Sequence, residues 1–453
     1  MRCSIAPAIL LFACLTTIAA ATFAENWNQF RGPAASGVAS ESALPIEWSA
    51  ERNIAWKQRI PGVGWSQPVV WGDKIFLTTA VADDQPRPDP AQMGPGVGGF
   101  AGFFKSFEPP ETNYRWLVLC LDADAGNILW EKTVREGRPT IHIHPNNTFA
   151  TETPAVDEER LIVHFGMHGV YAYSHDGELL WSKDLEAYPT QFGWGTGSSP
   201  VMHGDLVFIQ CDNDEQSWIA ALDKRTGDEV WRADRDENSN WGTPYLWKNS
   251  QRAELVASGG TAMRSYDPMS GKLLWQIAGG GRTASTPVSD GDLLYFDSYD
   301  RLTGSNGVVV AVKPGADGDI PLKTGDDAAR EFVAWARPMS GFRISSPTVA
   351  NGCLYLPEQG GGIVRCVDAA TGEEHYRKRI RGATGFSASP IAVGDRVYLT
   401  DQAGRTVVVK AGPELEVLAA NELSEMTWSS PAVVGRRLLI RTVDHLYAIG
   451  GPD

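Results

Sequence analysis

Short apolar segments separated by turns that contain glycine or proline recur along the whole chain. Leu206–Gln210 follows Gly204-Asp205, and Arg396–Thr400 follows Gly394-Asp395. Glycine supplies the positive φ that tight hairpin turns require. No stretch repeats apolar residues with the helical period of 3.6 over about ten residues or more. The pattern therefore predicts a series of short antiparallel strands and no long helices.

Two sequence motifs, which we call phrases, recur at a fixed period. In the first, a Gly lies four residues after an Asp, and an aromatic residue lies four residues after the Gly. It occurs at Asp122–Trp130, Asp223–Trp231, Asp267–Trp275 and Asp368–Tyr376, with a shortened version at Asp176–Trp181. Burial of a Trp contributes roughly 3–5 kcal/mol. We therefore expect these side chains to pack between repeat units: Trp130, Trp181, Trp231 and Trp275.

The second phrase is a Ser, Thr or Gln followed by Pro and a short apolar strand. It occurs eight times, at Pro68, Pro154, Pro200, Pro244, Pro287, Pro347, Pro390 and Pro431. Units of about 40–45 residues with four strands each are typical of propeller blades. The sequence therefore predicts an all-β fold, an eight-bladed β-propeller of four-stranded antiparallel blades.

The ends of the repeat region indicate how the ring closes. The last unit stops after Leu446–Ile449 without a fourth strand, whereas Asn53–Ile60 is a Trp-bearing strand with no blade before it. We expect Asn53–Ile60 to complete the last blade, which leaves no open sheet edge. The propeller then spans residues 53–450, with an N-terminal extension at 25–52 and insertions at 81–113 and 313–330.

Residues 1–24 have the features of a secretory signal peptide. Arg2 precedes the apolar Ile5–Ala21, and Thr22-Phe23-Ala24 suits a signal peptidase site. We expect an exported protein, periplasmic or extracellular, that is monomeric and has no transmembrane segment. Lipidation of Cys14 is the less favoured alternative, because Phe12 fits a lipobox poorly. The formal net charge of −15 argues against nucleic acid as a partner.

Four cysteines remain after the signal sequence. Cys353 and Cys366 lie at equal distances from the turn Glu358–Gly362, so a cross-strand disulfide between them is one prediction and free thiols are the alternative. Cys120 and Cys211 fall two blades apart and are expected to be buried free thiols. The chain has no Cys-x-x-Cys-His sequence, so no attached c-type haem is predicted.

The phrase Asp223–Trp231, echoed at Asp267–Trp275, resembles the docking repeat of quinoprotein dehydrogenases. The wider group of PQQ-like β-propellers shares it, including the outer-membrane assembly protein BamB. Trp27–Pro33 is similar to the leader of secreted PQQ-like repeat proteins. The enzymes of the group bind PQQ on the axis with Ca²⁺ held by Glu and Asn, a catalytic Asp and often a vicinal disulfide. This chain is shorter, has no vicinal cysteines, and offers no residue that matches those motifs by position.

The resemblance therefore implies a non-catalytic, exported scaffold that binds a protein or a ligand and needs no cofactor. The first alternative is a PQQ-dependent, quinoprotein-like redox enzyme with Ca²⁺. The second is a carbohydrate-binding propeller.

The loops that lead into the inner strands depart from the repeat and carry aromatic or basic residues. In a propeller they surround one mouth of the central channel and predict a surface for stacking and anion binding. The alternative is that the rings only close the axis. The predicted binding residues are Trp65, Phe149, Trp194, Trp241, Arg282, Phe342, Arg343, Phe386 and Trp428.

Two further segments carry candidate chemistry. Gly94–Phe104 lies in a long Gly/Pro-rich insertion, and its Phe100, Phe103 and Phe104 are predicted to dock on a partner or, alternatively, to cover the disc. His142 and His144 have the spacing of metal ligands on one strand face. Because no Cys or carboxylate follows at a matching interval, a polar loop is favoured and no metal is predicted.

Overall fold

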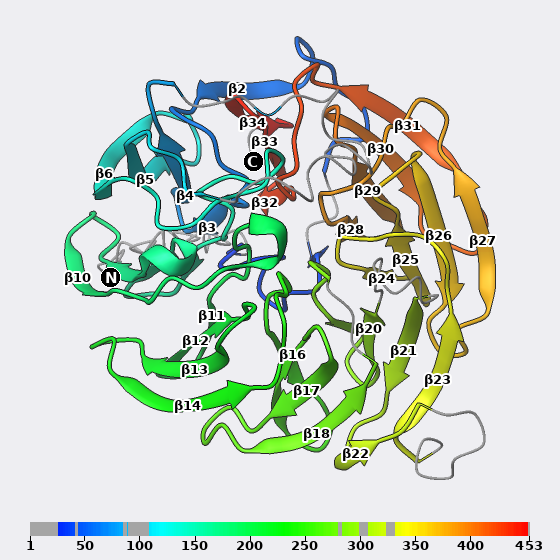
Figure 1. Ribbon diagram of the computed structural model, residues 1–453. Helices are drawn as coiled ribbons and strands as arrows, with labels where there is room; N and C mark the ends of the chain where they lie inside the picture. Colours follow the sequence, from blue (N-terminus) through cyan, green and yellow to red (C-terminus); the bar gives the residue numbers. More distant parts are fainter. Residues whose placement is uncertain are drawn as a thin grey trace, which may run out of the picture.

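Eight antiparallel blades surround a central axis in the computed structural model (Figure 1), which describes residues 26–40, 44–84, 88, 108–279, 283–298, 307–322 and 331–451. The first four blades are β3 (Val69–Trp71), β4 (Lys74–Val81), β5 (Tyr114–Asp122) and β6 (Ile128–Gly137); β7 (Ala155–Val156), β8 (Leu161–His164), β9 (Val170–Tyr173) and β10 (Leu179–Lys183); β11 (Val201–His203), β12 (Leu206–Cys211), β13 (Ser217–Asp223) and β14 (Glu229–Arg235); and β15 (Tyr245–Lys248), β16 (Ala253–Ala257), β17 (Ala262–Tyr266) and β18 (Leu273–Ala278).

The remaining four blades repeat this order from the axis outwards. They are β19 (Val288–Ser289), β20 (Leu294–Ser298), β21 (Val308–Val312) and β23 (Val333–Pro338); β24 (Thr348–Ala350), β25 (Cys353–Pro357), β26 (Ile363–Asp368) and β27 (Glu374–Arg379); β28 (Ile391–Val393), β29 (Arg396–Thr400), β30 (Arg405–Lys410) and β31 (Val417–Glu422); and β32 (Ala432–Val434), β33 (Arg437–Arg441), β34 (His445–Ile449) and β2 (Ile54–Arg59). The predicted eight-bladed propeller is confirmed.

The ring closes as the sequence predicts. β2 pairs antiparallel with β34, with Trp56 opposite Ala448, and so supplies the outer strand of blade 8. Two additional strands extend single blades in parallel: β1 (Val38–Ala39) pairs with β28 at the inner edge of blade 7, and β22 (Gly318–Ile320) pairs with β18 at the outer edge of blade 4. Short 3-10 helices include η2 (Gly166–His168) and η3 (Gln191–Gly193).

A belt of hydrogen bonds around the axis explains why Ser or Thr precedes most of the repeat prolines. Among the described residues, seven backbone N–H groups each donate to the hydroxyl of the equivalent residue in the next blade at 2.9–3.1 Å. The belt runs through Gln67, Thr153, Ser199, Thr243, Thr286, Ser346, Ser389 and Ser430. Each bond satisfies a buried backbone donor, and the belt therefore ties neighbouring inner strands together.

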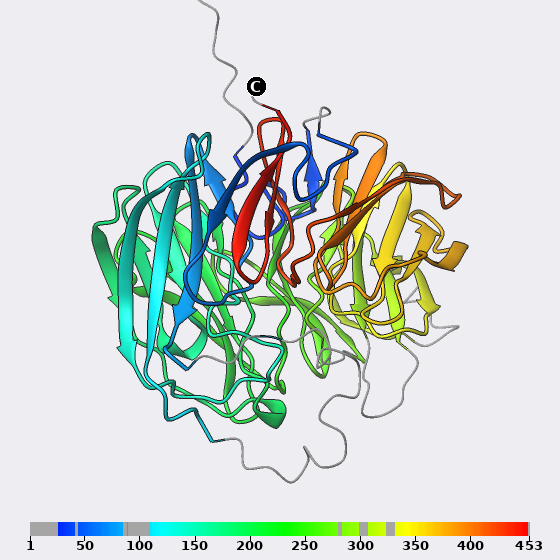
Figure 2. The same ribbon diagram turned by 90° about the horizontal axis from the view of Figure 1, so that it is seen from above.

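The N-terminal extension crosses the axis in the middle of the ring, where Figure 1 shows it in dark blue. We call residues 26–40 the axial segment. Its backbone carbonyls at Trp27 and Asn28 accept hydrogen bonds from Val70 and Val156, at 2.8 Å each. The fully buried Arg31 donates its N–H to Gln67 Oε1 at 2.7 Å, where the belt has Gln in place of Ser or Thr. Figure 2 shows this segment at the opposite face of the disc from η3.

Tryptophan docking closes most blade interfaces. An outer-strand indole N–H donates at 2.9–3.1 Å to a carbonyl in the turn before the last strand of the next blade, and its ring covers the turn glycine. A Cβ on that glycine would lie 2.5–3.1 Å from the ring, so the phrase requires Gly. The docked pairs are Trp56 with Gly126, Trp130 with Gly177, Trp181 with Gly227, Trp231 with Gly271 and Trp335 with Gly372.

The fourth predicted docking residue, Trp275, is also buried between blades, in a cluster with Leu294 and Val312 of blade 5. Its indole N–H, however, donates at 2.6 Å to Glu254 Oε2 of its own blade. The expectation that the repeat Trp side chains pack between blades is therefore confirmed for Trp275 too, although its hydrogen bond differs.

The predicted disulfide is not formed. Cys353 lies opposite Asp368, and Cys366 lies opposite Tyr355, so the two cysteines are displaced by two positions along the hairpin. All four cysteines among the described residues are buried free thiols, as expected for Cys120 and Cys211. Burial raises the pKa of Cys366, which keeps its thiol protonated.

Several expectations concern parts of the chain outside the described residues. These are the signal peptide at 1–24 with Cys14, Arg282, and Gly94–Phe104 with Phe100, Phe103 and Phe104. Among the residues that the structure describes, no helix has the length and apolar character needed to cross a membrane.

Candidate functional site at the channel mouth

The loops that lead into the inner strands meet at one face of the disc, opposite the axial segment (Figure 2). We call this region the channel mouth. Its tryptophans form two pairs, in which Trp194, Trp241 and Trp428 are partly exposed and Trp65 is buried. Trp65 stacks on Trp428 with centroids 6.4 Å apart, and Trp194 packs on Trp241 at 5.4 Å. That Trp194, Trp241 and Trp428 line a binding surface stays a prediction, whereas Trp65 is buried and does not line one.

The loop between blades 1 and 2 connects the two groups. The Trp65 indole donates to Asn146 O at 3.0 Å, and Asn147 Nδ2 donates to Trp194 O at 2.8 Å. The Trp241 indole donates to Gly195 O at 2.7 Å. These bonds fix ring orientations through the backbone, so the mouth is built before any ligand arrives.

Two of the predicted rings belong to the core instead. Phe149 is 6 % exposed and contacts Tyr114 edge-on, with centroids 4.8 Å apart. Phe386 is fully buried in the cluster between blades 6 and 7. Their loops turn inwards, and the prediction that they line a binding surface is wrong. Phe342 is partly buried.

Arg343 also differs from its prediction. Its guanidinium forms a bidentate ion pair with Asp297, at 2.5 and 2.7 Å, and both side chains are almost fully buried. A bidentate charge-assisted pair fills the acceptor capacity that an incoming anion would otherwise supply. Arg343 therefore joins blades 5 and 6, and the anion-binding prediction for it is wrong.

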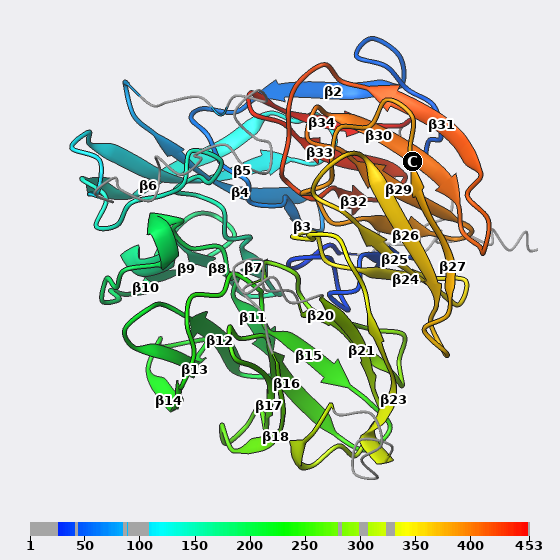
Figure 3. The same cartoon turned by 45° about the vertical axis from the view of Figure 1, so that its right-hand side comes forward.

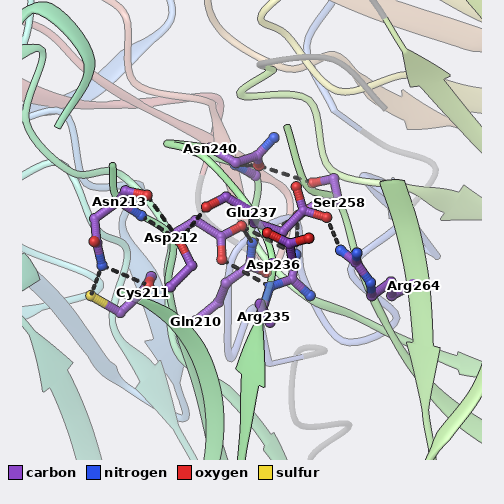
Figure 4. A network of polar contacts seen from close by, with 12 residues as sticks. Gln210, Cys211, Asp212, Asn213, Arg235, Asp236, Glu237, Asn240, Ser258 and Arg264 are labelled. Atoms are coloured by element: carbon purple, nitrogen blue, oxygen red, sulfur yellow. Dashed lines mark hydrogen bonds and ion pairs between the residues drawn. The ribbon is translucent and has the colours of Figure 1, made fainter. Parts of the chain in front are cut away.

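A second ion-pair network supports the loop that carries Trp241 (Figure 4). Arg235 Nε donates to Asp212 Oδ1 at 2.8 Å, and both side chains have no exposed surface. Glu237 pairs with Arg264 and accepts the N–H of Thr261 at 2.6 Å. Charges buried in this way are stable only when their hydrogen bonds are satisfied. The network therefore holds blades 3 and 4 together beneath the mouth.

Asn240 connects this network to the mouth. Its Oδ1 accepts Ser258 Oγ at 3.2 Å and the N–H of Gly242 at 2.9 Å. Trp241 lies between Asn240 and Gly242, so the network also fixes the position of this ring.

Glu152 is a residue that the sequence reasoning missed. It is 2 % exposed, and its Oε1 has no hydrogen-bond partner among the described residues. Burial raises the pKa of Glu152 to about 7, although a hydrogen bond from Thr196 opposes the shift. Nearby His164 donates through Nδ1 to Ser198 O at 3.1 Å, and burial lowers the pKa of His164 to about 4. Both groups are thus largely uncharged between about pH 4 and pH 7.

A sequence signal for Glu152 exists. The residue two positions before the repeat proline is Ser in five of the eight blades: Ser66, Ser198, Ser285, Ser345 and Ser429. Blade 2 replaces it with a carboxylic acid, a departure from the repeat that marks an unusual position.

His142 and His144 lie in a polar loop that hydrogen bonds hold in place. His142 Nδ1 hydrogen-bonds Gly193 O at 2.7 Å, and His144 Nδ1 accepts the N–H of Asn146 at 3.1 Å. Within the described part of the chain, no three His, Cys, Asp or Glu side chains converge as a metal site would require.

A tricarboxylate cofactor such as PQQ would need several free cations around the axis. Of the guanidiniums described near the channel, Arg343 binds Asp297, and Arg441 donates to Ser66 Oγ at 2.5 Å. Arg343 is therefore occupied by a carboxylate, whereas Arg441 donates to neutral oxygens of Ser66, and no reaction step is derived through PQQ.

The fold and its docking repeat define a β-propeller of the PQQ-like class. The chain belongs to the family described as outer membrane protein assembly factor BamB, whose sequence model matches residues 112–214, 215–320 and 324–442. BamB of Yersinia pestis is 21% identical over 309 residues, which cover 56% of this chain and 75% of that protein. Tetrathionate hydrolase of Acidithiobacillus ferrooxidans is 21% identical over 74% of this chain, and the match spans 62% of the hydrolase.

Solved structures show the same fold. BamB from Moraxella catarrhalis superposes with a TM-score of 0.54 at 14% identity, over 83% of this chain and 97% of that one. Quinohemoprotein alcohol dehydrogenase from Comamonas testosteroni gives a TM-score of 0.58 at 12% identity, over 95% of this chain and 81% of the enzyme. The fold is thus shared by an assembly factor and by redox enzymes, and function has to be argued from the residues.

Proposed function

We propose that this chain is an exported, non-catalytic propeller scaffold that docks a partner protein on its outer rim. Three observations support the proposal. The chain belongs to a family described as an assembly factor, and the buried ion pairs Arg235–Asp212 and Arg343–Asp297 help to hold blades together. The third observation is an apolar stripe on the rim. The stripe carries the argument, because exposed contiguous apolar surface on a soluble protein marks interaction sites.

The apolar stripe lies on the outer strands of consecutive blades, which Figure 3 shows one after another as β6, β10 and β14. The residue just before each docking Trp is exposed: Leu129 by 51%, Leu180 by 45% and Val230 by 52%. In blade 6 the equivalent residue is His375, beside the exposed Glu374. Exposed apolar residues also occur on β31 of blade 7, at Val417 and Leu418, so the polar reference on the rim is blade 6.

The chain itself shows how a rim strand can be covered. β22 adds in parallel to β18, with Gly318 opposite Trp275, and Ser49 forms a parallel bridge with Glu422 at the edge of β31. Among the strands that the structure describes, none is added to the outer edge of β6, β10 or β14. An edge strand with unpaired backbone groups accepts an added strand from a partner, and the flanking side chains provide specificity.

Site-specific photo-cross-linking in the native host tests this surface. A photoreactive amino acid at position 180 or 230 is expected to give the same partner adduct, identified by mass spectrometry. Position 375 is the matched control on the opposite side of the rim. Absence of adducts at 180 and 230, or equal adducts at 375, would contradict rim docking.

A redox enzyme that uses PQQ and Ca²⁺ is the second candidate, favoured by Glu152, whose buried Oε1 has no hydrogen-bond partner among the described residues. Titration of the mature protein with both ligands, followed by melting temperature and quinone absorbance, tests it directly. A ligand that binds only the folded state raises the melting temperature. We expect no shift, whereas saturable binding with dye reduction by an alcohol panel would replace the scaffold proposal.

A further inference from the structure

We propose that four rings at the channel mouth bind a neutral saccharide. Phe192, Trp194, Trp241 and His144 form what we call the ring platform. This role is separate from partner docking, since the platform lies at the axis and the apolar stripe lies on the rim.

The platform is a continuous surface centred on Trp194. The Trp194 centroid lies 5.6 Å from Phe192, 5.4 Å from Trp241 and 6.0 Å from His144. All four side chains are partly exposed. The rings are inclined to Trp194, by 40° for Trp241, 53° for Phe192 and 84° for His144, so the platform presents several ring faces. Such a surface suits a ligand with a flat apolar face, as the C–H face of a pyranose ring provides.

The three loops of the platform are locked together. Asn147 Nδ2 donates to Trp194 O at 2.8 Å and to Thr196 O at 3.0 Å, joining the loop before blade 2 to the loop before blade 3. Gly195 has φ +80°, and a Cβ there would lie 2.7 Å from Ile143 Cγ2. The loops approach as closely as glycine allows. A ligand therefore meets a pre-organised surface and loses little free energy to ordering it.

The backbone of Phe192 is held in an unfavourable conformation. Its φ of 51° and ψ of 25° place a bulky aromatic residue in the left-handed region. Such a residue costs on the order of 1–3 kcal/mol and persists where the surroundings enforce it, commonly at ligand sites. The Phe192 side chain remains partly exposed, so full burial does not offset this cost. The conformation instead keeps the ring beside Trp194.

The polar groups on the platform are uncharged. The Trp194 indole N–H has no hydrogen bond within the described residues. His144 uses Nδ1 as an acceptor for the Asn146 N–H, which leaves Nε2–H as a second free donor in the neutral ring. Burial, and then His142, lowers the pKa of His144, so the ring is neutral at neutral pH. Two neutral donors match hydroxyl oxygens, and the net charge of −15 disfavours anionic ligands.

Calorimetric titration of the mature protein with neutral oligosaccharides tests the proposal. The probes are hexasaccharides of β-1,4-glucose, α-1,4-glucose, N-acetylglucosamine, mannose and xylose, with Trp fluorescence as the second readout. We expect at least one to bind saturably, and Trp194→Ala to weaken it about tenfold or more. Trp71→Ala is the control, because Trp71 is a partly exposed tryptophan at the far end of its inner strand.

Phe192→Gly separates binding from folding. Glycine relieves the left-handed strain, so the melting temperature should stay or rise while saccharide binding weakens. No binding by any probe up to about 10 mM overturns the proposal, and so does binding that survives both platform variants. Neither result affects the cross-linking at positions 180 and 230, so the two proposals fail independently.

Discussion

The blade interfaces that follow the repeat differ from those that depart from it. At five interfaces a tryptophan of one blade covers the turn glycine of the next, as Trp181 covers Gly227. Three other interfaces, between blades 4 and 5, 6 and 7, and 7 and 8, are packed by contacts other than a Trp on a turn glycine. The comparison shows that a closed propeller requires every interface to be packed but does not require one motif to pack them all.

Between blades 4 and 5, a buried carboxylate takes the place of the docking carbonyl. Glu254 Oε2 accepts both the Trp275 indole and Ser265 Oγ at 2.6 Å. β22, from the insertion of blade 5, then pairs with β18 and covers the outer edge of blade 4. The insertion thus supplies packing that the repeat turn supplies elsewhere.

The two interfaces of blade 7 rely on tyrosine and on the N-terminal extension. Tyr355 of blade 6 hydrogen-bonds the Gly412 backbone in the blade 7 turn, where a Trp would otherwise dock. Toward blade 8, Asn421 Oδ1 accepts the Trp48 N–H at 2.8 Å, and Trp48 stacks on Tyr398. The contacts of Trp48 join residues more than 300 positions apart, so they depend on ring closure, whereas Tyr355 and Gly412 are 57 positions apart.

The largest expected decrease in stability comes from a substitution that disrupts a regular interface. Gly227→Ala places a Cβ 2.6 Å from the Trp181 ring at a residue with φ +77°. Strain and overpacking together should lower the free energy of unfolding by about 3–4 kcal/mol, measured by denaturant titration. Gly204→Ala is the matched control: φ is +57° and no atom lies within 4 Å of the new Cβ, so only about 1 kcal/mol is expected.

Equal decreases in the free energy of unfolding for the two variants would mean that only backbone strain destabilises them. The Trp–Gly contact would then not stabilise the interface. A larger loss for Gly227→Ala assigns the difference to the docking contact.

Sequence alone predicts the regular interfaces because their determinants are local. The Asp, Gly and Trp of each phrase sit on one hairpin, and even the partner glycine belongs to the next copy. Ring closure by Asn53–Ile60 is predictable because this strand carries the repeat Trp and the last unit lacks its fourth strand. The irregular interfaces are not, because Glu254 and Asn421 carry no repeated pattern. Tyr355 has an equivalent in Tyr295, but the partner of its hydroxyl is determined only in the folded ring.

The channel mouth shows the same division. The sequence identifies the loops that carry the two tryptophan pairs, Trp65 with Trp428 and Trp194 with Trp241, but not the burial of Trp65. Arg343 differs because its partner, Asp297, lies 46 residues earlier on another blade, and nothing local signals that pair. The inward turn of Phe386 likewise depends on tertiary packing.

A smaller effect is expected at the interface of blades 7 and 8, and it depends on pH. Glu425 follows β31 of blade 7 and accepts hydrogen bonds from Thr442 at 2.6 Å, Tyr447 at 2.7 Å, His445 at 2.9 Å and Lys57 at 2.9 Å, all in blade 8. Burial acts to raise the pKa of Glu425, but these four hydrogen bonds outweigh it and lower the pKa to about 2. Its contribution to stability is therefore present above pH 4.5 and lost as pH falls toward 2.

Glu425→Gln should cost about 2 kcal/mol at pH 7, allowing for partial solvent screening. The difference from the unsubstituted protein should shrink as the pH falls from 4.5 to 2, followed by denaturant titration at each pH. Gly227→Ala is the reference, since its cost is steric and should not vary with pH. A pH-independent cost for Glu425→Gln would show that the carboxylate charge does not hold blades 7 and 8 together.

The smallest effect concerns the interface of blades 6 and 7. The Tyr355 hydroxyl accepts the Gly412 N–H at 2.7 Å and donates to Gly412 O at 3.3 Å. Tyr355→Phe leaves this backbone donor without its partner and should cost about 1–2 kcal/mol in denaturant unfolding. Tyr295 occupies the equivalent place on β20, but its hydroxyl donates to Asp290 within the same blade. Tyr295→Phe should cost only about 0.5 kcal/mol, because water can replace a bond to a turn carboxylate. A Tyr355 variant no less stable than the Tyr295 variant would mean that the aromatic ring, and not the hydroxyl, substitutes for the docking tryptophan at this interface.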